Sequence, residues 1–206
     1  MRRFSLKTFL LLVMLCGALL ALDLVQFRYR KLETEVVRLR KEVGHLGPID
    51  PNRFNIVQVP TPTEPLVWKW RIRAPLGKRC EWFIQFNGIP EEGLPDFDLG
   101  CSSRAQFAST EDGELLTVAL VENPDGRYAI SFTGTELSAR CGGQPLEILD
   151  GPGETNTAGA EGTQSFKADE PIVLIRRRVM EPTGVNSFSL PQGEARGFMI
   201  WLVPLP

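Results

Sequence analysis

The sequence predicts a mainly β protein, in which one N-terminal transmembrane helix continues into a short coiled coil and then into an antiparallel β-sandwich or jelly-roll-like domain. Three observations predict this fold. Apolar residues recur at helical spacing up to Leu46, prolines crowd residues 47–65, and the rest alternates apolar and polar residues in short runs between turn residues. A chain of 206 residues has room for one ordinary domain and its accessory segments.

The basic head and the apolar run behind it predict a membrane anchor. Residues 1–7 carry three cationic side chains, and fifteen uncharged residues follow from Thr8 to Leu22. At about 1.5 Å per residue this run spans roughly 22 Å, short of a ~30 Å hydrocarbon core, so Leu24 and Val25 must complete the span. We therefore predict a short cytoplasmic head at 1–7 and a transmembrane signal anchor at 8–25.

The apolar run also permits a second interpretation, a cleaved signal peptide, because Cys16-Gly17-Ala18 provides a small-residue cleavage site. Against cleavage, the apolar periodicity continues in phase through that site to Leu22. The basic head would be costly to move across the membrane, so the N-terminus is expected in the cytoplasm and the C-terminal domain outside it. These features predict a single-pass protein of the cell membrane.

Beyond the membrane segment, apolar residues recur at alternating steps of four and three, which is the spacing of a coiled coil. Valine or tyrosine at heptad position a with leucine mostly at d favours a parallel dimer, and Glu35 at g would face Arg40 at e of the partner. A lone amphipathic helix lying on the membrane or on the protein's own domain is the alternative. We predict a coiled-coil stalk at 25–46 whose homodimer seam consists of Val25, Tyr29, Leu32, Val36, Leu39, Val43 and Leu46.

Proline and glycine end the helical pattern at Gly47-Pro48, and the proline-rich segment 47–65 reads as a stiff linker with one short strand at 54–59. A β-sandwich domain is expected at 66–206, where Asn123-Pro124-Asp125-Gly126 has the residues of a hairpin turn. The segment 151–162, rich in glycine and threonine, reads as an exposed mobile loop. Alternation predicts strands at 68–73, 80–86, 115–121, 127–133, 172–179 and 198–203.

Charge is divided unevenly along the chain. Residues 1–54 carry 10 Lys and Arg against 5 Asp and Glu, a net charge of +5, whereas residues 55–206 carry 13 against 20, a net charge of −7. An acidic domain argues against nucleic acid as a partner, because phosphate binding needs a positive field. Three cysteines, Cys80, Cys101 and Cys141, lie in this domain, so two of them are expected to pair if the domain is exported.

The sequence offers no recognisable catalytic or metal-binding pattern. His45 is the one histidine, and the heptad puts it on the outside of the stalk, which removes Ser-His-Asp, Cys-His and His-based metal arrangements from the domain. The carboxylates at Glu91-Glu92 and Asp96-Phe97-Asp98 match neither a calcium loop nor a recognisable glycosidase pair and read as loop residues. We expect a protein that is not an enzyme, with no catalytic residues, no metal site and no cofactor.

The remaining candidates concern binding. Arg176, Arg177 and Arg178 interrupt an apolar strand, where charges typically protect an edge strand, and Arg176 and Arg178 form a possible binding surface for an anionic partner. Four tryptophans are expected in the core rather than on a sugar-stacking platform.

We therefore expect a dimeric, non-enzymatic envelope protein that presents a β-sandwich to an unknown envelope partner; the alternative is a membrane-tethered module that binds a ligand or polysaccharide. The layout of short head, single span, coiled coil and β-rich domain resembles that of bacterial division and rod-shape scaffold proteins.

Overall fold

A computed structural model of the chain describes residues 6–64, 66–95, 101–105, 112–134, 138–144, 151–184 and 187–205, and of residues 6–8, 41, 101–105 and 138–144 it describes the backbone alone. The chain divides into two units, Met1–Glu42 and Val43–Pro206.

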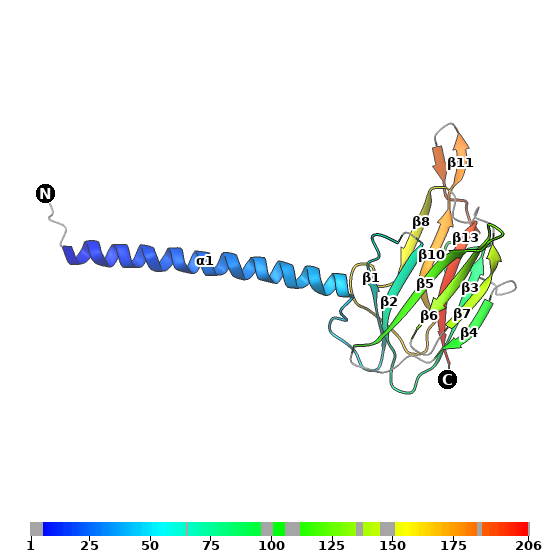
Figure 1. The fold of residues 1–206 in the computed structure, drawn as a ribbon, viewed down its shortest axis with the longest axis horizontal. Helices are drawn as coiled ribbons and strands as arrows, with labels where there is room; N and C mark the ends of the chain where they lie inside the picture. The colour runs from blue at the N-terminus through cyan, green and yellow to red at the C-terminus, as the bar shows by residue number, and fades with distance from the viewer. Residues whose placement is uncertain are drawn as a thin grey trace. The chain divides into compact units, whose positions relative to one another are not determined.

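The first unit is formed by a single helix, α1, which runs from Leu6 to Val43 over 38 residues (Figure 1). Asp23 does not interrupt it, so the apolar and the charged segments form one continuous helix, as the sequence predicts. Within Phe9–Arg40 the helix is long enough and apolar enough to cross a membrane, with a mean hydropathy of 2.3 over an 18-residue window. Because it lies near the N-terminus, it meets the requirements of a membrane anchor and of a signal sequence alike.

The helix ends at Val43, earlier than Gly47-Pro48 predicts. Gly44 follows it with a φ of 65°, the left-handed conformation that commonly terminates helices. A Cβ atom at Gly44 would lie 2.3 Å from Cγ2 of Val59, so a larger residue would also be excluded by packing. Leu46 is therefore not on the helix: it is 3% exposed and belongs to the β unit. His45 likewise lies beyond the helix rather than on its outer face.

The second unit consists of antiparallel sheets. The larger, sheet A, has six strands in the order β7-β6-β5-β2-β1-β9. Its strands are β1 (Phe54–Val59), β2 (Val67–Arg73), β5 (Glu114–Glu122), β6 (Tyr128–Thr133), β7 (Ser138–Gln144) and β9 (Gln164–Phe166).

Sheet B has five strands in the order β4-β3-β13-β10-β8. Its strands are β3 (Cys80–Phe86), β4 (Cys101–Ala105), β8 (Gly153–Thr157), β10 (Ile172–Val179) and β13 (Gly197–Pro204). A separate two-stranded hairpin, β11 (Glu181–Gly184) and β12 (Ser187–Ser189), projects from the unit beyond the end of β10 (Figure 1).

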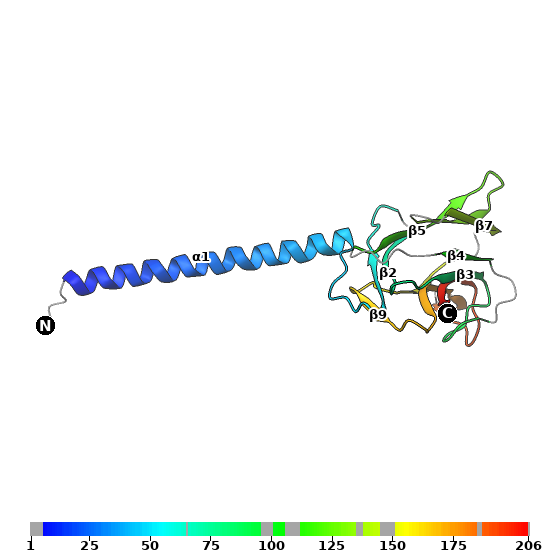
Figure 2. The same ribbon diagram turned by 90° about the horizontal axis from the view of Figure 1, so that it is seen from below.

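The two sheets share one hydrophobic core. Figure 2 shows β5 and β7 in one layer and β3 and β4 in the other. Trp82 of β3 stacks on Phe132 of β6 with ring centroids 3.8 Å apart, and Trp68 of β2 meets Phe198 of β13 at 5.3 Å. Burial of these large rings supplies a substantial part of the apolar free energy of folding. The largest fully buried side chains of this core include Trp70, Phe54, Phe132 and Phe198.

The strands predicted from alternation are present, but three other predictions about the domain are wrong. Segment 47–65 contains the predicted strand at 54–59, but this strand is β1 of sheet A, between β2 and β9, and not part of a separate linker. Segment 151–162 is not a loop throughout, because β8 pairs with β10 along its whole length. The arginine-rich strand is not at an edge, because β10 pairs with β13 on one side and with β8 on the other.

Candidate functional site

Arg176 and Arg178, the predicted binding surface, hold two loops of the domain itself. Arg176 donates through Nη1 to the carbonyl oxygen of Glu91 at 2.6 Å and through Nη2 to that of Gly93. Arg178 is 5% exposed, and its Nη2 donates to the carbonyl oxygens of Pro191 and Gly193, both at 2.8 Å. The two side chains therefore attach the loops that precede β4 and β13 to sheet B.

The electrostatic setting of these arginines does not favour an anion. Burial, together with the nearby charge of Arg178, lowers the pKa of Arg176. The two guanidinium groups line a cavity of about 250 Å³ that is also lined by Glu91, Glu92 and Glu154. Three carboxylates beside two cations make this a region of mixed charge. Asp96 and Asp98, the other predicted loop carboxylates, lie outside the described residues.

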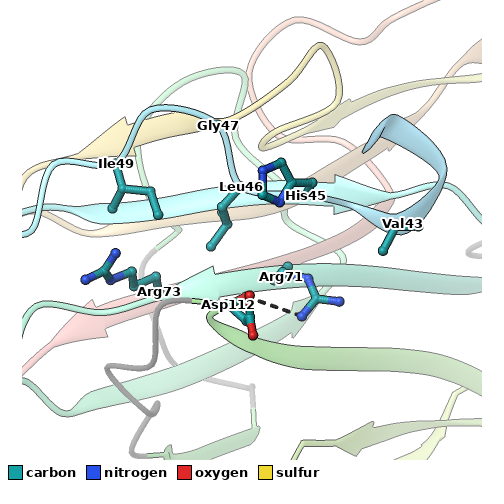
Figure 3. Close-up of a pocket in the computed structure, with 8 residues that line it drawn as sticks. All are labelled: Val43, His45, Leu46, Gly47, Ile49, Arg71, Arg73 and Asp112. Atoms are coloured by element: carbon teal, nitrogen blue, oxygen red, sulfur yellow. Dashed lines mark hydrogen bonds between the residues drawn. The ribbon is translucent and has the colours of Figure 1, made fainter. Parts of the chain in front are cut away.

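A larger cavity, of about 640 Å³, lies beside β2 within the second unit (Figure 3). Its volume is in the range of small-molecule sites. It combines basic side chains of one strand with apolar side chains of the segment that leads into β1. Its lining residues are Val43, His45, Leu46, Gly47, Ile49, Arg71, Arg73 and Asp112. We call it the β2 cavity.

The local sequence explains why two arginines line the β2 cavity. In β2, Trp70 and Ile72 are fully buried and point into the core. Alternation along a strand then places Arg71 and Arg73 on the opposite face of sheet A. Arg71 donates from Nε to the carbonyl oxygen of Gly44 at 3.1 Å and from Nη1 to that of Asp112 at 3.3 Å. Arg71 thereby joins the segment after the helix to the start of β5.

The turn that follows the apolar lining segment is held by an asparagine. Asn55 of β1 has no exposed surface and makes four hydrogen bonds. Its Nδ2 donates to the carbonyl oxygens of Asp50 and Arg53, and its Oδ1 accepts from the backbone N–H of Asp50 and from Oγ of Ser165. These bonds fix the turn at 50–53 and, through it, the segment that carries Leu46 and Ile49.

Histidine and cysteine supply no metal centre in the described part of the chain, where no three His, Cys, Asp or Glu side chains are arranged to hold a metal ion. Cys80 is buried and has a free thiol, and burial raises its pKa to about 12, so it is an inert core residue. The side chains of Cys101 and Cys141 lie outside the described residues, so the expectation that two of the three cysteines of the domain pair stays a prediction.

The tryptophans are buried or half-buried, as predicted from alternation. Trp70 and Trp82 lie in the shared core, and Trp201 lies in a smaller buried cluster with Ile89 and Met199. All three are at most 3% exposed, and Trp68 is half-buried against Phe198. No open sugar-stacking platform is formed by these four side chains.

Reasoning from the sequence missed the β2 cavity. Alternation predicts only a strand at 68–73, and the heptad assigns Leu46 and His45 to the stalk. The available signal was the run of three cations at alternate positions, Lys69, Arg71 and Arg73, in an otherwise acidic domain. Comparisons with protein families, with curated proteins and with solved structures found no match to this chain.

Proposed function

We propose that this chain is a non-enzymatic, single-pass membrane protein that dimerises through α1 and presents its β domain, a β-sandwich, to a partner in the cell envelope. One observation carries the proposal. A single unbroken helix joins an apolar segment to a charged segment in which apolar residues keep coiled-coil spacing. Such a helix suits a membrane anchor that continues into a stalk. The described lining of the β2 cavity and of the cavity at Arg176 and Arg178 holds no recognisable catalytic arrangement.

Exposure of the predicted seam is compatible with dimerisation, as is that of the other apolar side chains of the helix. The apolar side chains of the seam that lie on α1 remain between 37% and 71% exposed in a single copy of the chain. Their burial against a second copy would remove this apolar surface from water, which is the main driving force of coiled-coil association. These residues are Val25, Tyr29, Leu32, Val36, Leu39 and Val43.

Charged residues on the stalk are compatible with this arrangement. Arg38 forms ion pairs along the helix with Glu35 at 2.6 Å and Glu42 at 2.7 Å. These pairs are exposed and contribute little to stability. Glu35 can therefore leave its ion pair with Arg38 and form one with Arg40 of a second copy at little cost in free energy.

Site-specific cross-linking in native membranes tests the dimer. In a Cys16→Ser background, Leu39→Cys places a thiol at heptad position d, and Thr34→Cys places one at the outward position f. We expect mild oxidation to link two chains through position 39 and not through position 34. Equal linking at both positions, or at neither, would contradict the parallel seam.

A reporter fused after Pro206 tests the orientation. We expect activity outside the cytoplasm, because the basic head favours a cytoplasmic N-terminus. Cytoplasmic activity of the fusion would overturn this topology without affecting the dimer.

A membrane-tethered ligand-binding module is the second candidate function. The β2 cavity favours it, because its volume suits a small molecule and its lining combines cationic and apolar side chains. The burial of three tryptophans speaks against a polysaccharide as that ligand, since sugar rings are bound by exposed aromatic faces.

A further inference from the structure

The β2 cavity contains two cationic groups that come from one strand. Arg71 and Arg73 are two residues apart on the outer face of β2, which separates their Cα atoms by roughly 7 Å. Figure 3 shows both side chains lining the cavity, together with Asp112. At this spacing one carboxylate-sized group can approach both guanidinium groups.

Neither arginine is neutralised by an acidic side chain in the part of the chain that the structure describes. Arg71 donates its hydrogen bonds to two carbonyl oxygens, which carry no formal charge. Arg73 makes no hydrogen bond or ion pair with the described residues, whose ion pairs involve other side chains. Two like charges side by side repel each other, so the cavity favours an anion that is shared between them.

Lys69 provides a comparison on the same strand. It lies on the same face of β2, outside the cavity, and its Nζ is 2.9 Å from a carboxylate oxygen of Glu64. Among the residues that the structure describes, the cation outside the cavity is therefore paired with a carboxylate, whereas the two inside it are not.

The remaining lining limits what kind of anion fits. Leu46 and Ile49 form an apolar wall, with Leu46 buried and Ile49 half-buried (Figure 3). With Arg71, Arg73 and the carboxylate of Asp112, the formal charges of the lining sum to +1 when His45 is neutral. A ligand with a single negative charge and a short apolar group matches both properties.

We propose that the β2 cavity binds a small monocarboxylate, whose carboxylate lies between Arg71 and Arg73 and whose short aliphatic part contacts Leu46 and Ile49. The planar guanidinium fork suits a carboxylate, with which it forms paired, charge-assisted hydrogen bonds. The inference does not depend on dimerisation or on membrane orientation. It rests on the second candidate function, a tethered ligand-binding module, and gives that module a ligand class.

Isothermal titration calorimetry of the full chain in detergent micelles, with empty micelles subtracted, tests the proposal. The probes are hexanoate, acetate, hexanol and inorganic phosphate. We expect hexanoate to bind more tightly than acetate, which lacks most of the apolar group, and hexanol, which lacks the charge. Phosphate, largely dianionic at pH 7.5, should bind more weakly than hexanoate because of Asp112.

Three variants make the test specific. Arg73→Gln removes a cation without internal partners and should weaken hexanoate binding at least about tenfold without lowering the unfolding temperature. Lys69→Gln removes a cation from the same face outside the cavity and should leave binding unchanged. Asp112→Asn should strengthen binding of hexanoate and most strongly that of phosphate, since it removes the competing negative charge.

Several results would overturn the monocarboxylate site. They are the absence of hexanoate binding at millimolar concentration, equal binding by the Arg73→Gln variant, or tighter binding of hexanol or phosphate than of hexanoate. Because cross-linking through Leu39→Cys measures the dimer separately, failure of one proposal is distinguishable from failure of the other.

Discussion

The side chain of Asn55 provides a sharp test of whether the segment before β2 belongs to the folded domain. The change is Asn55→Ala. It removes the four hydrogen bonds that join β1 to the turn at 50–53 and to Ser165. The sequence alone places this asparagine in a short strand of a linker outside the domain, where its replacement would have little effect.

The expected loss follows from burial and hydrogen bonding. Because Asn55 has no exposed surface, water cannot replace its side chain at the buried hydrogen-bond partners, and only partners near the surface can bond to water instead. At about 1 kcal/mol for each net hydrogen bond, the free energy of unfolding should fall by roughly 2–4 kcal/mol. For a domain of this size, that corresponds to a drop of roughly 5–12 °C in unfolding temperature.

Tryptophan fluorescence of the full chain in detergent micelles measures the change, because all four tryptophans lie in the β domain. Asn52→Ala is the matched control: Asn52 is exposed in the same turn, and the bond that it makes to Asp50 uses its backbone N–H. The control should differ from the wild type by less than about 0.5 kcal/mol. Equal stability of the Asn55→Ala and Asn52→Ala variants would refute the view that the turn and β1 unfold together with the core.

Three further predictions follow from the helix, a crowded glycine and the cysteines. Leu32→Asp combined with Leu39→Asp should convert the dimer to monomer in sedimentation, while Thr34→Asp should not; a wild-type chain that sediments as a monomer would remove the basis of the test. Gly159→Ala should lower the free energy of unfolding, measured by chemical denaturation, by at least about 2 kcal/mol, because φ is 72° and the new Cβ would lie 2.7 Å from Cα of Val57. Gly193→Ala is the control: its φ is 78°, but the space around it is open, so the loss should be only about 1 kcal/mol. Mass spectrometry of protein purified without reductant should find Cys80 free and alkylated only after denaturation, and Cys101 linked to Cys141; free Cys101 and Cys141 would reject the bridge.

Most of the fold could be predicted from the sequence because the interior strands carry strong alternation. The strand β8 could not, since Gly153–Thr157 contains no large apolar side chain and becomes a strand through its pairing with β10. The end of the helix was placed too late because Leu46 continues the heptad by coincidence, its apolar character being required by the core instead. Local periodicity does not distinguish these two uses of a leucine.

The candidate site was much less predictable. The sequence singles out Arg176 and Arg178 as charges in an apolar strand. The carbonyl groups that accept their hydrogen bonds, however, lie 85 residues away for Arg176 and 15 residues away for Arg178. The β2 cavity combines three separate segments, at 43–49, at 71–73 and at Asp112. Such a combination depends on the order of strands in sheet A, which pairs β2 with β1 and β5, and no spacing within one segment reveals it.

The position of β13 has a consequence for biosynthesis. The strands β3 and β10 are not hydrogen-bonded to each other; β13 lies between them and follows both in sequence. Sheet B therefore cannot assemble until β13 has been synthesised, long after the apolar helix has left the ribosome. The helix of an exported chain would therefore reach the membrane while the β domain is still unfolded. A narrow translocation channel accepts a chain in that state, and the domain would complete its folding on the far side of the membrane.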